Sequence, residues 1–261
     1  MTTLTAAPGM QIAADAPIPF GRLVRTELRK LTDTRANRWL LTAIIAATPV
    51  IVVVVLFALK PADLTYQKFV DITQAPQKFL LPALGILTMT SEWSQRTGLT
   101  TFTLVPNRRR VLLAKFSATL ALGLVVVLVA FAAAAAGNLL GGLRHGNGSW
   151  AFGPAGFGEI ALVQVCGLIE GMAFGMALLI PAAALVLYYV VPSLWSALDG
   201  SSSGLKRIAP WVDMSQAQSG MYTRSITATG WVHLAAASAI WILAPLVLGV
   251  VRVSRTEVKS G

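Results

Sequence analysis

Two carboxyl groups within apolar sequence are the first candidates for chemistry. Glu170 lies near the middle of an apolar run, and Glu159 begins that run eleven residues earlier. Eleven residues are close to three helical turns of about 3.6 residues, so we expect both groups on one helix face. A carboxyl group placed in a membrane is costly and is by default a functional candidate. One interpretation is that the two carboxyl groups line a polar substrate path or form a proton-linked site. The alternative is that Glu170 is hydrogen-bonded and holds helices together.

The other reactive residue types do not form a recognisable site. His145 and His233 lie far apart, without Cys or carboxylate at ligand spacing, so we expect no metal site. Cys166 is the single cysteine and reads as a small buried residue. The serines at 201–203 lack the G-x-S-x-G context of a serine hydrolase. The chain also lacks the G-x-x-x-x-G-K-[ST] phosphate-binding sequence, so we expect no enzyme activity and no cofactor in this chain.

Composition indicates the class of protein in which these residues lie. The chain of 261 residues is 55% hydrophobic and 12% charged, whereas soluble domains have about a quarter charged residues. Several continuous apolar runs reach the ~20 residues that span a bilayer. They lack the period-two alternation of barrel strands. We therefore predict an all-α polytopic membrane protein.

The runs predict six transmembrane helices in a single transmembrane domain, residues 20–251. Residues 1–19 are expected to be a disordered cytoplasmic tail, and residues 252–261 a second cytoplasmic tail. We expect polar loops at 60–77 and 199–230. The predicted spans are 39–59, 77–91, 116–140, 159–179, 182–198 and 231–251.

An amphipathic segment, Phe20–Arg38, precedes the first span. Its apolar residues recur at helical spacing, and basic residues such as Arg25 cover the remaining face. This pattern is typical of a helix lying in the membrane interface. The alternative is a positive flank that only sets topology.

A polar segment of about 25 residues, Ser91–Lys115, separates the second and third spans and is too charged to lie in hydrocarbon. We predict a cytoplasmic loop that carries a short amphipathic helix. Its candidate functional residues are Glu92, Arg96, Thr97, Pro106, Arg108, Arg109, Arg110 and Lys115. The Arg run at 108–110 also fits a role confined to topology and lipid headgroups.

Charge distribution predicts orientation. The N-terminal segment, the central loop and the C-terminal tail together carry twice as many Lys and Arg residues as the opposite loops. This excess predicts that the termini and the central loop are cytoplasmic.

Small residues at four-residue spacing predict close helix packing, more within the chain than between copies. They are Gly137 and Gly141 at the end of the third span, and Gly167, Gly171 and Gly175 in the fourth.

Three ordered sets of residues resemble the permease subunits of ABC-2 type exporters, in the six-span form common in actinobacteria. The first is Glu27 with Lys30, the E-x-x-K type signature of an elbow helix. The second set follows the second span. The third set lies at the end of the last span. They are Glu92, Trp93, Thr97, Thr103, Pro106, Arg108, Ala114 and Lys115, and then Trp241, Pro245, Leu246, Gly249 and Arg255.

The resemblance implies an ATP-driven exporter in the bacterial plasma membrane. A separate nucleotide-binding subunit would hold ATP and Mg²⁺, and the central loop would hold a coupling helix that docks on it. A second permease copy or paralogue would complete the complex. A hydrophobic or amphipathic cargo, such as a drug, peptide or lipid, would leave between the permeases. Two alternatives stay open: an ion-coupled secondary transporter that uses Glu170, and a non-transporting membrane scaffold or immunity component.

Overall fold

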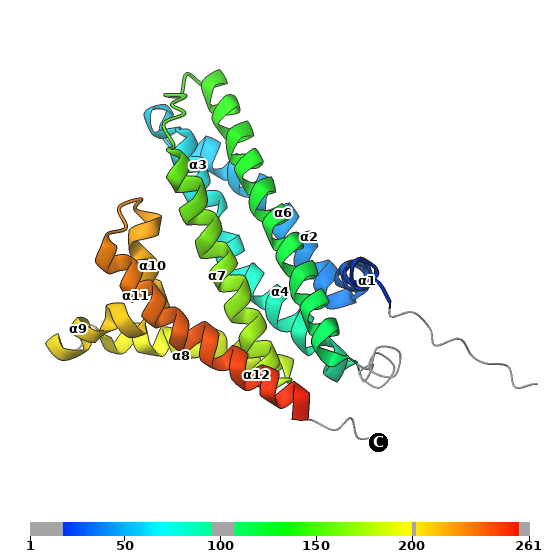
Figure 1. Cartoon of the computed structure of the whole chain (residues 1–261). Coiled ribbons are helices and arrows are strands. Elements are labelled where there is room, and N and C mark those ends of the chain that lie inside the picture. Colours follow the sequence, from blue (N-terminus) through cyan, green and yellow to red (C-terminus); the bar gives the residue numbers. More distant parts are fainter. Residues whose placement is uncertain (1–17, 96–106, 200–201, 256–261) are drawn as a thin grey trace, which may run out of the picture.

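The computed structural model describes residues 18–95, 107–199 and 202–255, and all regular structure within these ranges is helical (Figure 1). The first half contains α1 (Phe20–Asp33), α2 (Arg35–Ala58), η1 (Pro61–Asp63), α3 (Tyr66–Thr73), α4 (Ala75–Ser94) and α6 (Arg108–Leu143). The second half contains α7 (Pro154–Leu178), α8 (Pro181–Asp199), α9 (Ser203–Val212), α10 (Met214–Tyr222), α11 (Ala228–Ser238), η2 (Ala239–Leu243) and α12 (Ala244–Arg255).

Five helices in the described ranges are long and apolar enough to cross a membrane. They are α2, α6, α7, α8 and the continuous helix formed by α11, η2 and α12. These helices support a polytopic membrane protein. The second predicted span corresponds to α4, which is less apolar and is not among the five.

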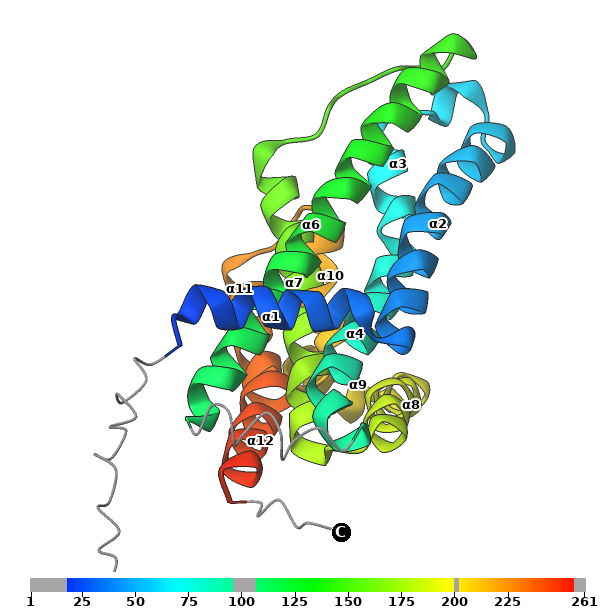
Figure 2. The ribbon, with the colours of Figure 1, turned by 90° about the vertical axis from the view of Figure 1, so that its right-hand side faces the viewer.

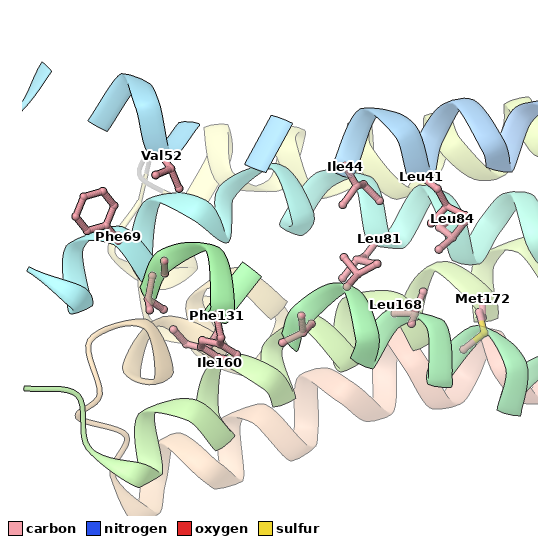
Figure 3. Packing of buried hydrophobic residues seen from close by; sticks show 14 of the residues in the cluster. Leu41, Ile44, Val52, Phe69, Leu81, Leu84, Phe131, Ile160, Leu168 and Met172 are labelled. Atoms are coloured by element: carbon pink, nitrogen blue, oxygen red, sulfur yellow. The ribbon is translucent and has the colours of Figure 1, made fainter. Parts of the chain in front are cut away.

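The core of the molecule lies between α2, α4, α6 and α7, with α3 closing one end (Figure 3). Leu81 and Leu84 of α4 face Leu168 and Met172 of α7, and all four side chains are almost fully buried. Two buried threonines of α4 form hydrogen bonds within the helix. The hydroxyl groups of Thr88 and its neighbour Thr90 donate to carbonyl oxygens one turn earlier. Burial therefore compensates for the lower hydropathy of α4.

The glycine stripe of α7 faces α4. A Cβ at Gly167 would lie 3.4 Å from the Pro82 side chain, and a Cβ at Gly175 would lie 2.9 Å from the Ile86 carbonyl oxygen. A Cβ at Gly171 would overlap the Pro82 carbonyl group. The absence of side chains thus allows the two backbones to approach closely. Gly137 and Gly141 of α6 instead pack against α3 and the residues before it, since their nearest neighbours are Phe69 and Leu64.

The two segments expected to be polar loops contain helices. In the first, the Thr65 hydroxyl caps α3 by accepting from the Lys68 backbone N–H, and Phe69 and Val70 are fully buried against the core. In the second, Asp213 caps α10. We predicted loops because both segments are polar in composition. They instead form short amphipathic helices, which are stabilised by packing one apolar face.

Helix α1 lies across the bundle and crosses α6 (Figure 2). It ends at Asp33, before the expected end at Arg38, because Thr34 is extended and α2 then begins at Arg35. Glu27 and Leu31 form its buried face.

Two features distinguish the second half. Helix α8 begins at Pro181 and runs across the end of α7, so that Figure 2 views it nearly end-on. Few of its residues are fully buried within the described part of the chain. The last long helix contains a π-helical turn, η2, which includes Trp241. Such turns occur often at functional sites.

Candidate functional site: a buried charge cluster

Four charged residues from three helices meet where α1 crosses the bundle. We call them the charge cluster: Glu27 and Lys30 of α1, Glu92 of α4 and Lys115 of α6. The Lys115 Nζ atom lies 3.2 Å from Glu92 Oε1 and 3.6 Å from Glu27 Oε2. The Lys30 Nζ atom lies 2.7 Å from Glu27 Oε1 and 3.4 Å from Glu92 Oε1. Each ammonium group therefore contacts both carboxylates.

Lys115 is the most enclosed member, with a side chain that is 2% exposed. Its ammonium group also donates to the Thr88 carbonyl oxygen and to the Ser91 hydroxyl oxygen, both at 3.3 Å. A buried lysine is tolerated only when it is paired and hydrogen-bonded. The end of α4 supplies both of these uncharged acceptors, so Lys115 fixes the start of α6 against α4.

Lys30 lies at the rim of the cluster, with a side chain that is 39% exposed. Burial by itself lowers the pKa of Lys30. The hydrogen bond and charge of Glu27, together with those of Glu92, outweigh burial and raise this pKa above its usual value of 10.5. Lys30 therefore remains an ammonium ion at neutral pH and links α1 to α4.

The cluster is balanced, because two carboxylates face two ammonium groups. Breaking one partner of such a buried set leaves an uncompensated charge, which is strongly destabilising. The cluster connects three helices that are distant in sequence. Its physical capacity is mechanical: it joins α1 to the facing ends of α4 and α6.

The Arg run lies in the first turn of α6, whereas we expected it in the loop. Asn107 caps this helix by accepting from the Arg110 backbone N–H. Arg108 donates to the Val253 carbonyl oxygen of α12 at 3.0 Å, and Arg110 donates to the Ile18 carbonyl oxygen at 2.9 Å. The start of α6 thus holds both the end of α12 and the segment before α1.

Arg109 and Arg25 are exposed on α6 and α1. Arg96, Thr97 and Pro106, and with them the predicted coupling helix, lie outside the described residues.

The two carboxyl groups of α7 lie in different surroundings. Glu170 is 4% exposed and lines a cavity, whereas Glu159 is half-buried and does not line it. One buried oxygen of Glu159, Oε2, has no hydrogen-bond partner among the described residues.

Sequence reasoning missed Gln164 of α7, whose side-chain amide donates to Gln74 Oε1 at 2.8 Å. It also missed Asp213. An amide within an apolar run was the available signal for Gln164, while Asp213 lay in a segment read as a loop.

Comparison of the chain with models of known protein families found no match, and comparison with curated proteins found none either.

Proposed function

We propose that this chain is the transmembrane permease subunit of an ATP-driven exporter. A separate nucleotide-binding subunit would bind ATP and Mg²⁺ and hydrolyse the nucleotide. A second permease copy or paralogue would complete the transport path. The chain itself would contribute no ATPase chemistry.

The charge cluster is the observation that best supports this proposal. The residues that suggested an elbow helix, Glu27 and Lys30, contact Glu92 and Lys115, which flank the central loop. A force applied to that loop would reach α4, α6 and α1 together, since their ends are joined by ion pairs. Closure of an attached ATPase could then move these helices as one rigid body.

The proposed orientation places the charge cluster on the cytoplasmic side of the plasma membrane. The excess of Lys and Arg in the N-terminal segment, central loop and C-terminal tail supports that orientation. The short opposite loops favour a hydrophobic or amphipathic cargo, such as a drug, peptide or lipid.

Co-expression with the nucleotide-binding subunit encoded beside this chain, followed by affinity purification and an ATPase assay, tests the proposal. Arg109 is exposed at the start of α6, so Arg109→Glu changes the proposed docking face without breaking the charge cluster. Arg207→Glu, on the exposed face of α9, is the matched control. We expect Arg109→Glu to reduce co-purification or ATPase activity, and Arg207→Glu to leave both unchanged. A chain that purifies stably without binding any such subunit would contradict the proposal.

The buried position of Glu170 favours one other candidate, an ion-coupled secondary transporter. Transport in proteoliposomes distinguishes the two. An ATP-driven exporter continues after a proton ionophore is added and stops when the ATPase is inactivated, whereas an ion-coupled carrier shows the reverse.

A further inference from the structure

A second candidate site lies away from the charge cluster and shares no residue with it. A cavity of about 170 Å³ opens between α4, α7, α8, α10 and η2. We call it the aromatic cavity. The residues that matter for its chemistry are Lys78, Glu170, Tyr188, Trp195, Asp213 and Tyr222.

Glu170 provides a carboxyl group that its surroundings leave uncompensated. It is 4% exposed, and no hydrogen bond or ion pair to its side chain forms within the described ranges. The charged form of such a group is costly unless a counter-charge arrives. A bound cation would supply that counter-charge.

The wall contains two other charged residues, which are of opposite sign. Lys78 Nζ lies 4.5 Å from the centre of the Tyr222 ring. Asp213 is fully engaged, because one oxygen accepts from the Ser215 backbone N–H at 2.8 Å and the other accepts from the Ser196 hydroxyl at 3.4 Å. Since Lys78 and Asp213 carry opposite charges, the wall of the cavity is net negative when Glu170 is ionised.

Aromatic rings form much of the remaining wall, and ring faces attract cations. Tyr188 and Tyr189 pack edge to face at 4.8 Å between ring centres, and Trp241 of the wall stacks on Phe174 behind it at 6.1 Å. Tyr189 and Trp241 already donate to the carbonyl oxygens of Phe79 and Val212. Their rings are therefore fixed before a ligand enters.

Two polar atoms of this wall have no hydrogen-bond partner in the described part of the chain. They are Trp195 Nε1 and the Tyr222 hydroxyl oxygen, and both are buried. The indole N–H can only donate, so a ligand that satisfies Trp195 must present an acceptor. Buried polar groups without partners are uncommon in folded proteins, so these two groups need an explanation.

We propose that the aromatic cavity binds a small organic monocation with one aromatic ring and an oxygen acceptor. Its ammonium group would face Glu170, and its oxygen would accept from Trp195. An engineered cavity of about 150 Å³ holds benzene, so the volume suits a single ring with a short chain. This claim needs no ATPase, so it can fail while the exporter proposal stands, and the reverse also holds.

Tyramine is a suitable probe because it carries one ring, one ammonium group and one hydroxyl. Its neutral analogue 4-ethylphenol and its anionic analogue 4-hydroxyphenylacetate differ from it mainly in charge. Binding of each to the purified full chain in lipid nanodiscs can be measured by isothermal titration calorimetry. A charge-assisted contact predicts that tyramine binds roughly ten- to a hundredfold more tightly than 4-ethylphenol, and that the anion binds most weakly.

Two variants test the assigned contacts. Glu170→Gln keeps the side-chain shape, and it should remove the preference for tyramine over 4-ethylphenol while 4-ethylphenol still binds. Glu159→Gln, on the same helix but outside the cavity, should leave the preference unchanged. Trp195→Phe removes the N–H donor, and it should abolish any advantage of tyramine over phenethylamine, which lacks the hydroxyl.

Retained binding of 4-ethylphenol shows that the Glu170→Gln chain is folded and that only the charge preference was lost. The proposal is overturned if tyramine does not bind the wild-type chain at millimolar concentration. It is equally overturned if the three analogues bind alike, or if Glu170→Gln keeps the preference for the cation.

Discussion

The Lys115 ammonium group lies 3.2 Å from the Glu92 carboxylate, and both side chains are almost completely buried. The two residues are separated by the central loop, yet they join the end of α4 to the start of α6. Glu27 and Lys30 of α1 complete the set. The stability of this junction therefore depends on charge balance, and substitutions that disturb the balance should have large effects.

Removing the charge of Lys115 should destabilise the chain strongly. Lys115→Met fills a similar volume but leaves Glu27 and Glu92 with only Lys30 to compensate them. Breaking a buried ion pair in this way costs about 3–5 kcal/mol. Thermal unfolding in detergent should show a clearly lower Tm, while Lys206→Met on the exposed face of α9 should leave Tm unchanged. Equal Tm values for the two variants would contradict the assigned ion pairs.

Removing both partners should cost less than the two single changes together. In the double variant Lys115→Met with Glu92→Leu, Glu27 and Lys30 remain as a neutral pair at 2.7 Å. A double-mutant cycle should give a coupling free energy of about 0.5–3 kcal/mol. Glu92→Leu combined with Lys206→Met provides the additive reference, because Lys206 lies on α9 and has no part in the cluster. Additivity in both cycles would show that Lys115 and Glu92 do not interact.

Alkaline pH should weaken the link that Lys30 makes between α1 and α4. The folded-state pKa of Lys30 is raised above 10.5, so its contribution is fully present below 10.5. That contribution is lost as pH rises through the raised folded value. Lys30→Arg keeps its charge at high pH and should lose less stability over the same range. Tm measured against pH for both proteins tests this, and identical alkaline profiles would be evidence against the prediction.

Adding a methyl group at Gly171, where α7 packs closely against α4, should destabilise the chain. In Gly171→Ala the new Cβ would overlap the backbone of Pro82, which cannot move as a flexible side chain can. Overpacking of this kind costs about 1–3 kcal/mol. Gly158→Ala on the same helix meets nothing within 4 Å and should stabilise the helix by about 0.5–1 kcal/mol. Tm changes of opposite sign are expected, and a neutral Gly171→Ala would show that the helices are farther apart.

Much of the helical structure could be predicted from local patterns of apolar residues. Apolar periodicity predicted a helix from Phe20, and the structure has one, although it ends at Asp33 and not at Arg38. The short helices α3 and α10 escaped prediction because each is polar in composition and depends on burial of one face, as Phe69 illustrates. The Arg run was predicted to lie in the loop because it is charged, but it forms the first turn of α6, which Asn107 caps.

The sequence by itself determined that long apolar helices dominate, since hydrophobicity over some twenty residues is a local property. The resemblance to known signature sequences also singled out Glu27, Lys30, Glu92 and Lys115. Only the tertiary structure decided that these four neutralise one another, and that Glu170 faces a cavity with Trp195. Both results depend on contacts between helices far apart in the chain, and the path of the backbone between them is not encoded in any single segment.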